Sequence, residues 1–147
     1  MPTKTTGKVW TDEERAAMAE SARERKASSK LSPAELREQG EKDLRAALAK
    51  MPPDERAMGE RLHALVADAA PSLAPKTYYG MPAWAKDGKV LCFFKPASKF
   101  DMRYATFGVE DVANLDEGTM WATSWALTKL TAADEKRIAA LVRKAVT

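Results

Sequence analysis

The sequence has one cysteine, Cys92, and one histidine, His63. A single cysteine excludes an internal disulfide and any zinc site built from several cysteines. Because nothing in the composition calls for an oxidising compartment, we expect a cytoplasmic protein. Residues 1–8 lack the apolar region of a secretory signal. No apolar run approaches the length of a membrane-spanning helix, which is roughly 20 residues, so we expect no membrane partner.

Neither sign of charge dominates, since the sequence has 24 Lys and Arg and 21 Asp and Glu. Residues 76–107, however, carry six basic and two acidic residues, together with eight of the eleven aromatic residues. This local excess can attract an anion or an acidic partner. It can equally be a set of solvated strand edges on which lysines discourage aggregation. Both interpretations stay open on the sequence alone.

Nucleic acid is not the expected partner of this aromatic and basic stretch. Exposed aromatic rings on a sheet can stack on bases while Lys and Arg bind phosphates. Aromatic residues in the middle of a sheet are nevertheless more often part of a core. Neither a helix-turn-helix nor an RNP-like motif is present.

The N-terminal third predicts a leader and a helical arm. Residues 1–9 are rich in Thr and Lys and predict a disordered leader. Residues 10–50 predict an arm of two helices, which start at Thr11 and at Ser32, each with a Glu at capping-box spacing, Glu14 and Glu35. Because the apolar stripe of this first helix is thin, we expect it to dock through Trp10. Docking on a second copy would make the protein a homodimer.

Residues 51–147 predict one α+β domain. Its first helix, from about 53 to 69, has a clear apolar face, and a last helix follows Thr131. Between them we expect strands at 77–79, resuming near 83, at 90–95, at 101–106 and at 124–130, and a short helix at 109–115. The fold class is therefore α+β, with an antiparallel sheet of about four strands packed by helices. The strand at 90–95 is apolar on both sides, which predicts a central position covered on both faces.

A family resemblance rests on three segments of this domain. The helix ending in Ala69-Ala70-Pro71, the run Tyr79-Gly80-Met81-Pro82-Ala83-Trp84 and the run Gly88-Lys89-Val90-Leu91-Cys92-Phe93-Phe94 together resemble the YdhG-like family. That family is catalogued mainly as a domain of unknown function. The resemblance implies a compact α+β domain from about Lys50 to Val146. One described member is a frataxin-like iron chaperone, which makes an intracellular iron chaperone the alternative function implied here.

The Tyr79-Gly80-Met81-Pro82 run has two interpretations. It can be a conformational corner, because Gly permits a bend and Pro cannot donate to a sheet ladder. It can also present aromatic side chains as the wall of a ligand site, with basic residues supplying an anion contact. The candidate ligand-binding residues are Tyr78, Tyr79, Met81, Trp84, Lys99, Arg103 and Trp121.

Catalytic chemistry has little support in the sequence, and no residue is predicted to be catalytic. His63 lies about 140° from Met58 on a helical projection at 100° per residue, which places it off the apolar face. Cys92 stands among apolar strand residues, where a thiol acts as a small hydrophobe. Iron would need oxygen ligands, and the candidate metal ligands are Glu110, Asp111, Asp116 and Glu117. We expect no resident cofactor, with iron as the alternative.

These observations predict a non-enzymatic binding or accessory protein. It would recognise a small molecule or a protein segment at the aromatic, basic rim of the sheet, and neither ligand nor partner can be named from the sequence.

Overall fold

The computed structural model describes residues 10–28 and 31–147, so the leader expected for residues 1–9 lies outside it. The α-helices are α1 (Asp12–Ser28), α2 (Pro33–Ala49), α3 (Pro53–Ala69) and α4 (Ala132–Ala145). The strands are β1 (Ala74–Tyr78), β2 (Met81–Lys86), β3 (Lys89–Lys95), β4 (Ala105–Val109) and β5 (Ser124–Leu127), with a short 3₁₀ helix, η1, at Ser98–Phe100. This order confirms the predicted α+β class. None of the described helices is both long and apolar enough to cross a bilayer.

The strands form one antiparallel sheet whose spatial order, β1-β2-β3-β4-β5, follows the chain. The sheet has five strands, one more than the approximate number predicted, because the chain turns back at Tyr79-Gly80 where the sequence predicts a bend within one strand. Tyr78 instead pairs with Met81. The two residues between them have φ values of 52° and 76°. Positive φ at both central positions is the geometry of a two-residue hairpin turn, whose twist matches that of the strands.

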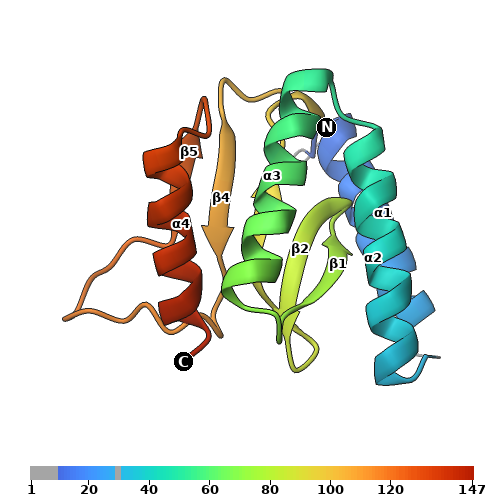
Figure 1. Cartoon of the computed structure of the whole chain (residues 1–147). Coiled ribbons are helices and arrows are strands. Elements are labelled where there is room, and N and C mark those ends of the chain that lie inside the picture. The colour runs from blue at the N-terminus through green and yellow to red at the C-terminus, as the bar shows by residue number, and fades with distance from the viewer. Residues whose placement is uncertain (1–9, 29–30) are drawn as a thin grey trace, which may run out of the picture.

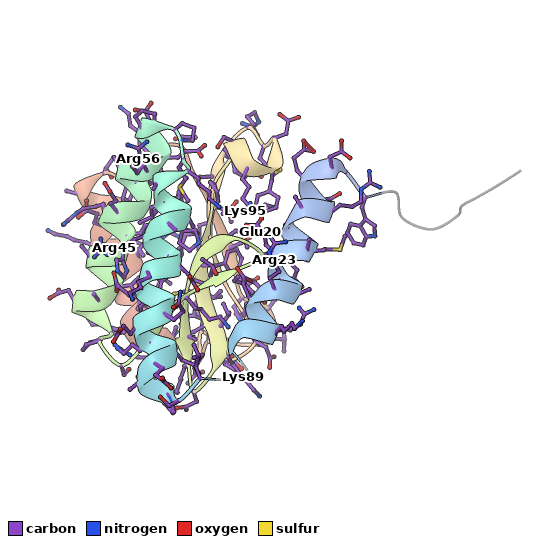
Figure 2. The ribbon with its side chains drawn as sticks, turned by 90° about the vertical axis from the view of Figure 1, so that its right-hand side faces the viewer. Glu20, Arg23, Arg45, Arg56, Lys89 and Lys95 are labelled. Atoms are coloured by element: carbon purple, nitrogen blue, oxygen red, sulfur yellow. The ribbon has the colours of Figure 1, made fainter. Side chains whose placement is uncertain are left out.

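Helices lie on both sides of the first hairpin but cover one face of the sheet more fully. α3 and α4 lie in front of the sheet in Figure 1, over what we call the covered face. Figure 2 shows β1 and β2 between α2 and α1, so α1 lies on the other side of the hairpin. The largest fully buried side chains are Trp84, Phe94 and Phe107, all on strands. They form the core between the sheet and the helices.

β3 is the middle strand of the sheet, as predicted. Cys92 and Phe94 are buried. Phe93, whose side chain points to the opposite face, is only half-buried and lies against Gly108. The expected covering of both faces of this strand is therefore only partial at Phe93. We call the face that carries Phe93 the open face.

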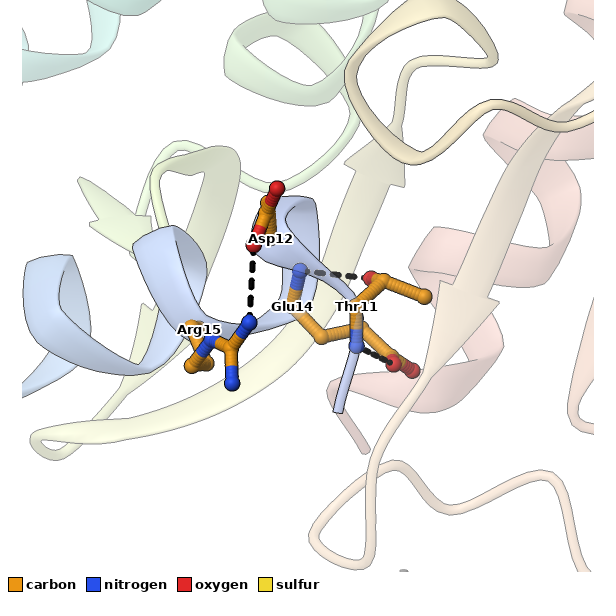
Figure 3. A network of polar contacts seen from close by, with 4 residues as sticks. All are labelled: Thr11, Asp12, Glu14 and Arg15. Carbon is orange, nitrogen blue, oxygen red and sulfur yellow. Dashed lines mark hydrogen bonds and ion pairs between the residues drawn. The ribbon is translucent and has the colours of Figure 1, made fainter. Parts of the chain in front are cut away.

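Capping boxes mark the starts of α1, α2 and α4, as their sequences predicted. At α1 the Thr11 N–H donates to the Glu14 carboxylate over 2.9 Å, and the Glu14 N–H donates to the Thr11 hydroxyl over 3.0 Å (Figure 3). Ser32 and Thr131 form the same reciprocal pair at α2 and α4. Each box satisfies two backbone N–H groups that the first helical turn leaves without partners.

The helical arm expected for residues 10–50 is not separate from the core over its second half. Leu44 and Leu48 of α2 are buried in the same cluster as Trp84 and Phe94. Gly40 lets α2 lie directly on β1, because a Cβ at this position would collide with a backbone carbonyl of β1. A glycine that weakens an isolated helix is here a condition of close packing.

The short helix predicted at 109–115 is absent. Backbone amides in this segment bond to distant parts of the chain: Glu110 N–H donates to the Leu91 carbonyl over 2.9 Å and Asn114 N–H donates to the Ala145 carbonyl over 2.8 Å. These partners replace the local bonds that a helix would make. The apolar residues of the segment 109–115 therefore have helical spacing although the segment is not a helix. Its backbone is held by the hydrogen bonds to Leu91 and Ala145 instead.

Several strand boundaries also differ from the prediction. β1 begins at Ala74 rather than at residue 77. The strand expected at 101–106 begins only at Ala105, because η1 and a left-handed Asp101, with φ 53°, occupy the residues before it. The strand expected at 124–130 ends at Leu127.

Candidate anion-binding site at the first hairpin turn

The turn between β1 and β2 directs two successive backbone N–H groups at one carboxylate. The amides of Tyr79 and Gly80 donate to the two carboxylate oxygens of Glu24 on α1, over 3.1 and 3.2 Å. Successive amides in such a turn form a concavity that suits an anion. Gly80 is required for the approach of α1 on two grounds. Its φ is positive, and a Cβ there would meet the Glu20 carboxylate.

Lys99 of η1 places a positive charge beside the same turn. Its Nζ donates to Oε1 of Glu20 over 2.7 Å, with both side chains only about a quarter exposed, at 28% and 23%. Glu20 and Glu24 are four residues apart and so lie on the same face of α1. Figure 2 shows Glu20 on the side of α1 that faces the hairpin. We call the N–H groups of Tyr79 and Gly80 together with the Lys99 ammonium the turn site.

The rest of the α1 interface is small. The buried α1 residues are Ala17 and Ser21, at 3% and 5% exposure, whereas Trp10, the expected anchor, is 39% exposed. Two small side chains bury little apolar area. The carboxylates of Glu20 and Glu24 are therefore a principal part of what holds α1 in place.

A cavity of about 790 Å³ adjoins the turn site between α1 and α2. Gly80 and Lys99 form one end, and Thr77 contributes from β1. The walls carry both signs of charge, with Asp43 and Lys50 on or just after α2. A space of this volume falls within the range of small-ligand sites.

Aromatic rings surround the turn site. The Tyr78 and Tyr79 rings meet edge to face with centroids 4.7 Å apart. Tyr78 reaches across the open face, where its hydroxyl donates to Glu110 over 3.0 Å. Burial, followed by this hydrogen bond and the Glu110 charge, raises the pKa of Tyr78 to about 12. The Lys99 ammonium also lies 5.9 Å from the centroid of Phe100.

Five of the predicted ligand-binding residues lie at one end of the sheet. Tyr78, Tyr79 and Met81 belong to the first hairpin, while Lys99 and Arg103 belong to the β3–β4 connection. In an antiparallel meander these two connections occur at the same end. Met81 is buried, so it supports the turn rather than lining a surface. The Arg103 guanidinium lies 5.1 Å from the centroid of the Tyr104 ring.

Trp84 and Trp121 do not join this group. Trp84 points to the covered face and is 1% exposed, because it lies one residue out of phase with Ala83 on the open face. Trp121 lies in the β4–β5 connection, at the opposite end of the meander. The expected aromatic wall therefore contains the tyrosines but neither tryptophan.

The predicted site did not include Glu20 and Glu24, which lie on α1, far along the chain from the turn. A signal was present, because both acidic residues occur on the same side of the helix as the thin stripe of Ala17 and its neighbours. Acidic residues on the inner face of a helix point to basic or N–H partners on the surface beneath it.

The candidate metal ligands Glu110, Asp111, Asp116 and Glu117 all follow β4 in the connection to β5. Glu110 accepts the hydrogen bond from Tyr78. Across residues 10–28 and 31–147, three or more His, Cys, Asp or Glu side chains nowhere form a group that could hold a metal ion. Iron binding by these carboxylates stays a prediction.

His63 is buried, contrary to the prediction from its helical position. Its Nδ1 lies 3.1 Å from Nε1 of Trp84, and its Nε2 lies 2.8 Å from Oε2 of Glu41. An indole N–H can only donate, so Nδ1 of His63 accepts that hydrogen bond. The ring proton is then on Nε2, which donates a hydrogen bond to the Glu41 carboxylate. With both ring nitrogens engaged, His63 links β2, α3 and α2. It lines a cleft of about 860 Å³ between α2 and α3.

Cys92 is fully buried, and burial raises the pKa of its thiol. The hydrogen bonds of His63 go to Trp84 and Glu41, so the two side chains do not form a thiol–imidazole pair. A thiol in such surroundings is inert as a nucleophile.

No family model, curated protein or solved structure matches this chain. The resemblance to the YdhG-like family therefore stays a prediction.

Proposed function

We propose that this is a non-enzymatic binding or accessory protein that recognises an acidic protein segment at the turn site. We propose further that α1 occupies the site in the absence of such a partner. The observation that carries the proposal is the Glu24 carboxylate held by the amides of both Tyr79 and Gly80. Hydrogen bonds to an ionised acceptor are about twice as strong as neutral ones.

The arrangement of α1 defines the partner chemistry. Its two carboxylates are one helical turn apart, and they meet the amide pair and Lys99 at the same time. A partner helix with two acidic residues at that spacing would satisfy the same donors. The aromatic rings of Tyr79 and Phe100 beside these donors would bury the stem of the partner segment.

α1 has the properties of a removable cover. It buries only small side chains, so little apolar area is lost when it leaves. Its attachment to the chain gives it an effective concentration in the millimolar range, against which a partner must compete. A partner with larger side chains could also contact the α2 side of the adjacent cavity, at Asp43 and Lys50, which α1 leaves unfilled.

The state of the usual catalytic groups supports a binding role. His63 has both ring nitrogens in hydrogen bonds. Cys92 is buried among apolar residues. A general base or nucleophile needs a free lone pair within reach of a substrate.

Peptide binding by the full chain tests the proposal. A fluorescent peptide copying residues 12–28 is titrated into the wild type and into the Glu20→Gln/Glu24→Gln variant, and anisotropy is measured. Because the variant releases α1 from the turn site, we expect it to bind the peptide at least about tenfold more tightly than the wild type does. Adding Lys99→Ala to the variant should weaken binding again.

Two controls distinguish recognition of the Glu20 and Glu24 carboxylates from a general effect of net charge. Glu13 is an exposed residue of α1, so Glu13→Gln changes the same charge without opening the site and should bind like the wild type. A peptide with Gln in place of both Glu20 and Glu24 should not bind the opened variant. Equal binding of the acidic and the Gln-substituted peptides would contradict the proposal.

A further inference from the structure

The two edge strands of the sheet, β1 and β5, differ in how far other parts of the chain cover their outer edges. At β1 the edge is covered, since Gly40 of α2 lies against a backbone carbonyl of Pro75. At the other edge β5 pairs with β4, and in the described part of the chain no strand lies on its outer side. Figure 1 shows α4 in front of β5, where it covers a face of the strand rather than its edge. An open edge offers a row of backbone groups to another strand.

The register identifies the backbone groups that face outward. The Val109 N–H donates to the Thr123 carbonyl over 2.8 Å. Hydrogen-bonded pairs alternate with non-bonded pairs in an antiparallel ladder, so Trp125 and Leu127 also bond to β4. The N–H and C=O groups of Ser124 and Ala126 therefore point away from β4. Both residues have exposed side chains, so nothing bulky shields these groups.

The composition of this edge lacks the usual protection. Residues 118–128, which include β5 and the segment before it, contain no charged residue and no proline. The segment exposes Met120 to 88% and Trp121 to 39%. Monomeric sheet proteins commonly protect an open edge with lysine, proline or a bulge. β1 carries both Pro75 and Lys76 in addition to its cover.

We propose that β5 pairs with β5 of a second copy of this chain, in antiparallel register about a two-fold axis. In such a pairing the residues near the axis lie close to their own counterparts, so a charged residue there would meet a like charge. The uncharged stretch at 118–128 removes that repulsion and favours a second copy as the occupant. The expected homodimer thus uses the sheet edge and leaves α1 on its own hairpin.

The two-fold register places complementary groups opposite one another. With the axis at Trp125, the outward groups of Ser124 face those of Ala126 in the second copy. The two Trp125 side chains then become neighbours in a non-bonded pair, where side chains approach most closely. Each Trp125 is half-buried and already packs on Phe107, with ring centroids 6.0 Å apart. The pairing would extend the core of one subunit into the other.

Sedimentation velocity of the full chain over a range of concentrations tests the proposal. The wild type should approach twice the 16.2 kDa mass of one chain. Ala126→Lys places a charge on the exposed side of the edge, and Ala126→Pro removes an outward N–H without touching the ladder to β4. Each substitution should raise the dimer dissociation constant at least about tenfold. Circular dichroism confirms that both variants fold.

Thr106→Lys is the matched control. Thr106 lies opposite Ala126 on β4 and has the same sheet face, but β4 is already paired on both sides. This variant should dimerise like the wild type. A wild type that stays monomeric at every concentration would overturn the proposal. So would a dimer that tolerates both Ala126 substitutions.

Discussion

The indole N–H of Trp84 donates to Nδ1 of His63 over 3.1 Å, and this bond joins the sheet to α3 inside the core. Nε2 of the same imidazole continues the chain of hydrogen bonds to Glu41 on α2. Three elements are thus tied together by one buried ring. Such a network stabilises the fold only when every member has its partner.

Removing the indole N–H should destabilise the protein. Trp84→Phe keeps an aromatic ring but leaves Nδ1 of His63 buried without a donor. We expect the free energy of unfolding to fall by about 2–4 kcal/mol, from the unsatisfied acceptor and the smaller ring. Urea denaturation measures the change. Trp121→Phe, at a partly exposed site, is the matched control and should stay within about 0.5 kcal/mol of the wild type.

Acid should weaken the same network. Burial of Glu41 opposes its ionisation, but the hydrogen bond from His63 and the Arg45 guanidinium outweigh burial, so the pKa of Glu41 lies below its ordinary value of 4.5. A lowered pKa in the fold contributes stability that is complete above the ordinary value and is lost as pH falls through the folded value. Glu41→Gln should therefore flatten the fall of unfolding free energy below pH 4.5.

Denaturation at a series of pH values checks this. Glu38→Gln, on the exposed side of the same helix, should retain the slope of the wild type. Identical slopes for the wild type and Glu41→Gln would show that Glu41 does not contribute in this way.

A methyl group at position 40 should be harmful even though it favours the helix. Gly40→Ala gains about 1 kcal/mol of helix propensity. It also drives a Cβ into a backbone carbonyl of β1, which cannot rotate away. We expect a net loss of about 1–2 kcal/mol in urea denaturation, since overpacking costs about 1–3 kcal/mol. The neighbouring Gln39→Ala is exposed and should be near neutral, so equal stability of both variants would refute the close approach.

Tyr78 should ionise at a higher pH than an ordinary tyrosine, because its pKa is raised to about 12. Its neutral form is favoured in the fold, so its contribution to stability is complete below the ordinary pKa of 10.0 and is lost as pH rises towards about 12. A pH titration of phenolate absorbance should lose its most alkaline step in Tyr78→Phe. Glu110→Gln removes a negative charge and should lower the pKa of Tyr78. A titration curve that Tyr78→Phe leaves unchanged at its alkaline end would contradict the assignment.

Local signals in the sequence were sufficient for the helices. The hydroxyl-to-carboxyl spacing at Thr11, Ser32 and Thr131 predicted three helix starts that the structure confirms. These motifs act within one turn of helix, so their outcome depends little on the rest of the chain. The α+β class followed from the same reasoning.

The position of His63 could not be read from apolar spacing. Its prediction used Met58 as the centre of the inner face, but Met58 is only half-buried. The buried face passes instead through Gly59, which is 40° from His63 on a helical projection. Gly59 has no side chain and therefore adds nothing to an apolar pattern, although Leu48 and Phe94 pack against it.

The sequence predicted the aromatic and basic residues of the candidate site but not its carboxylates. Tyr79 and Lys99 were found because aromatic and basic residues cluster in one stretch of the sequence. The carboxylates that meet them come from α1, and the contact between Glu24 and Tyr79 spans 55 residues. Such a contact depends on how the helix crosses the sheet, which no local pattern encodes.

The order of the strands in the sheet is also their order of synthesis. Each strand can therefore pair with one that has already left the ribosome, beginning with the Tyr79-Gly80 hairpin. α4 is made after all five strands, and it brings Ile138 and Val142 into the core. A chain stopped at residue 130 would present the covered side of β4 and β5, including Phe107, to solvent. Synthesis of residues 131–147 is thus the step that covers the exposed apolar face of the nascent sheet.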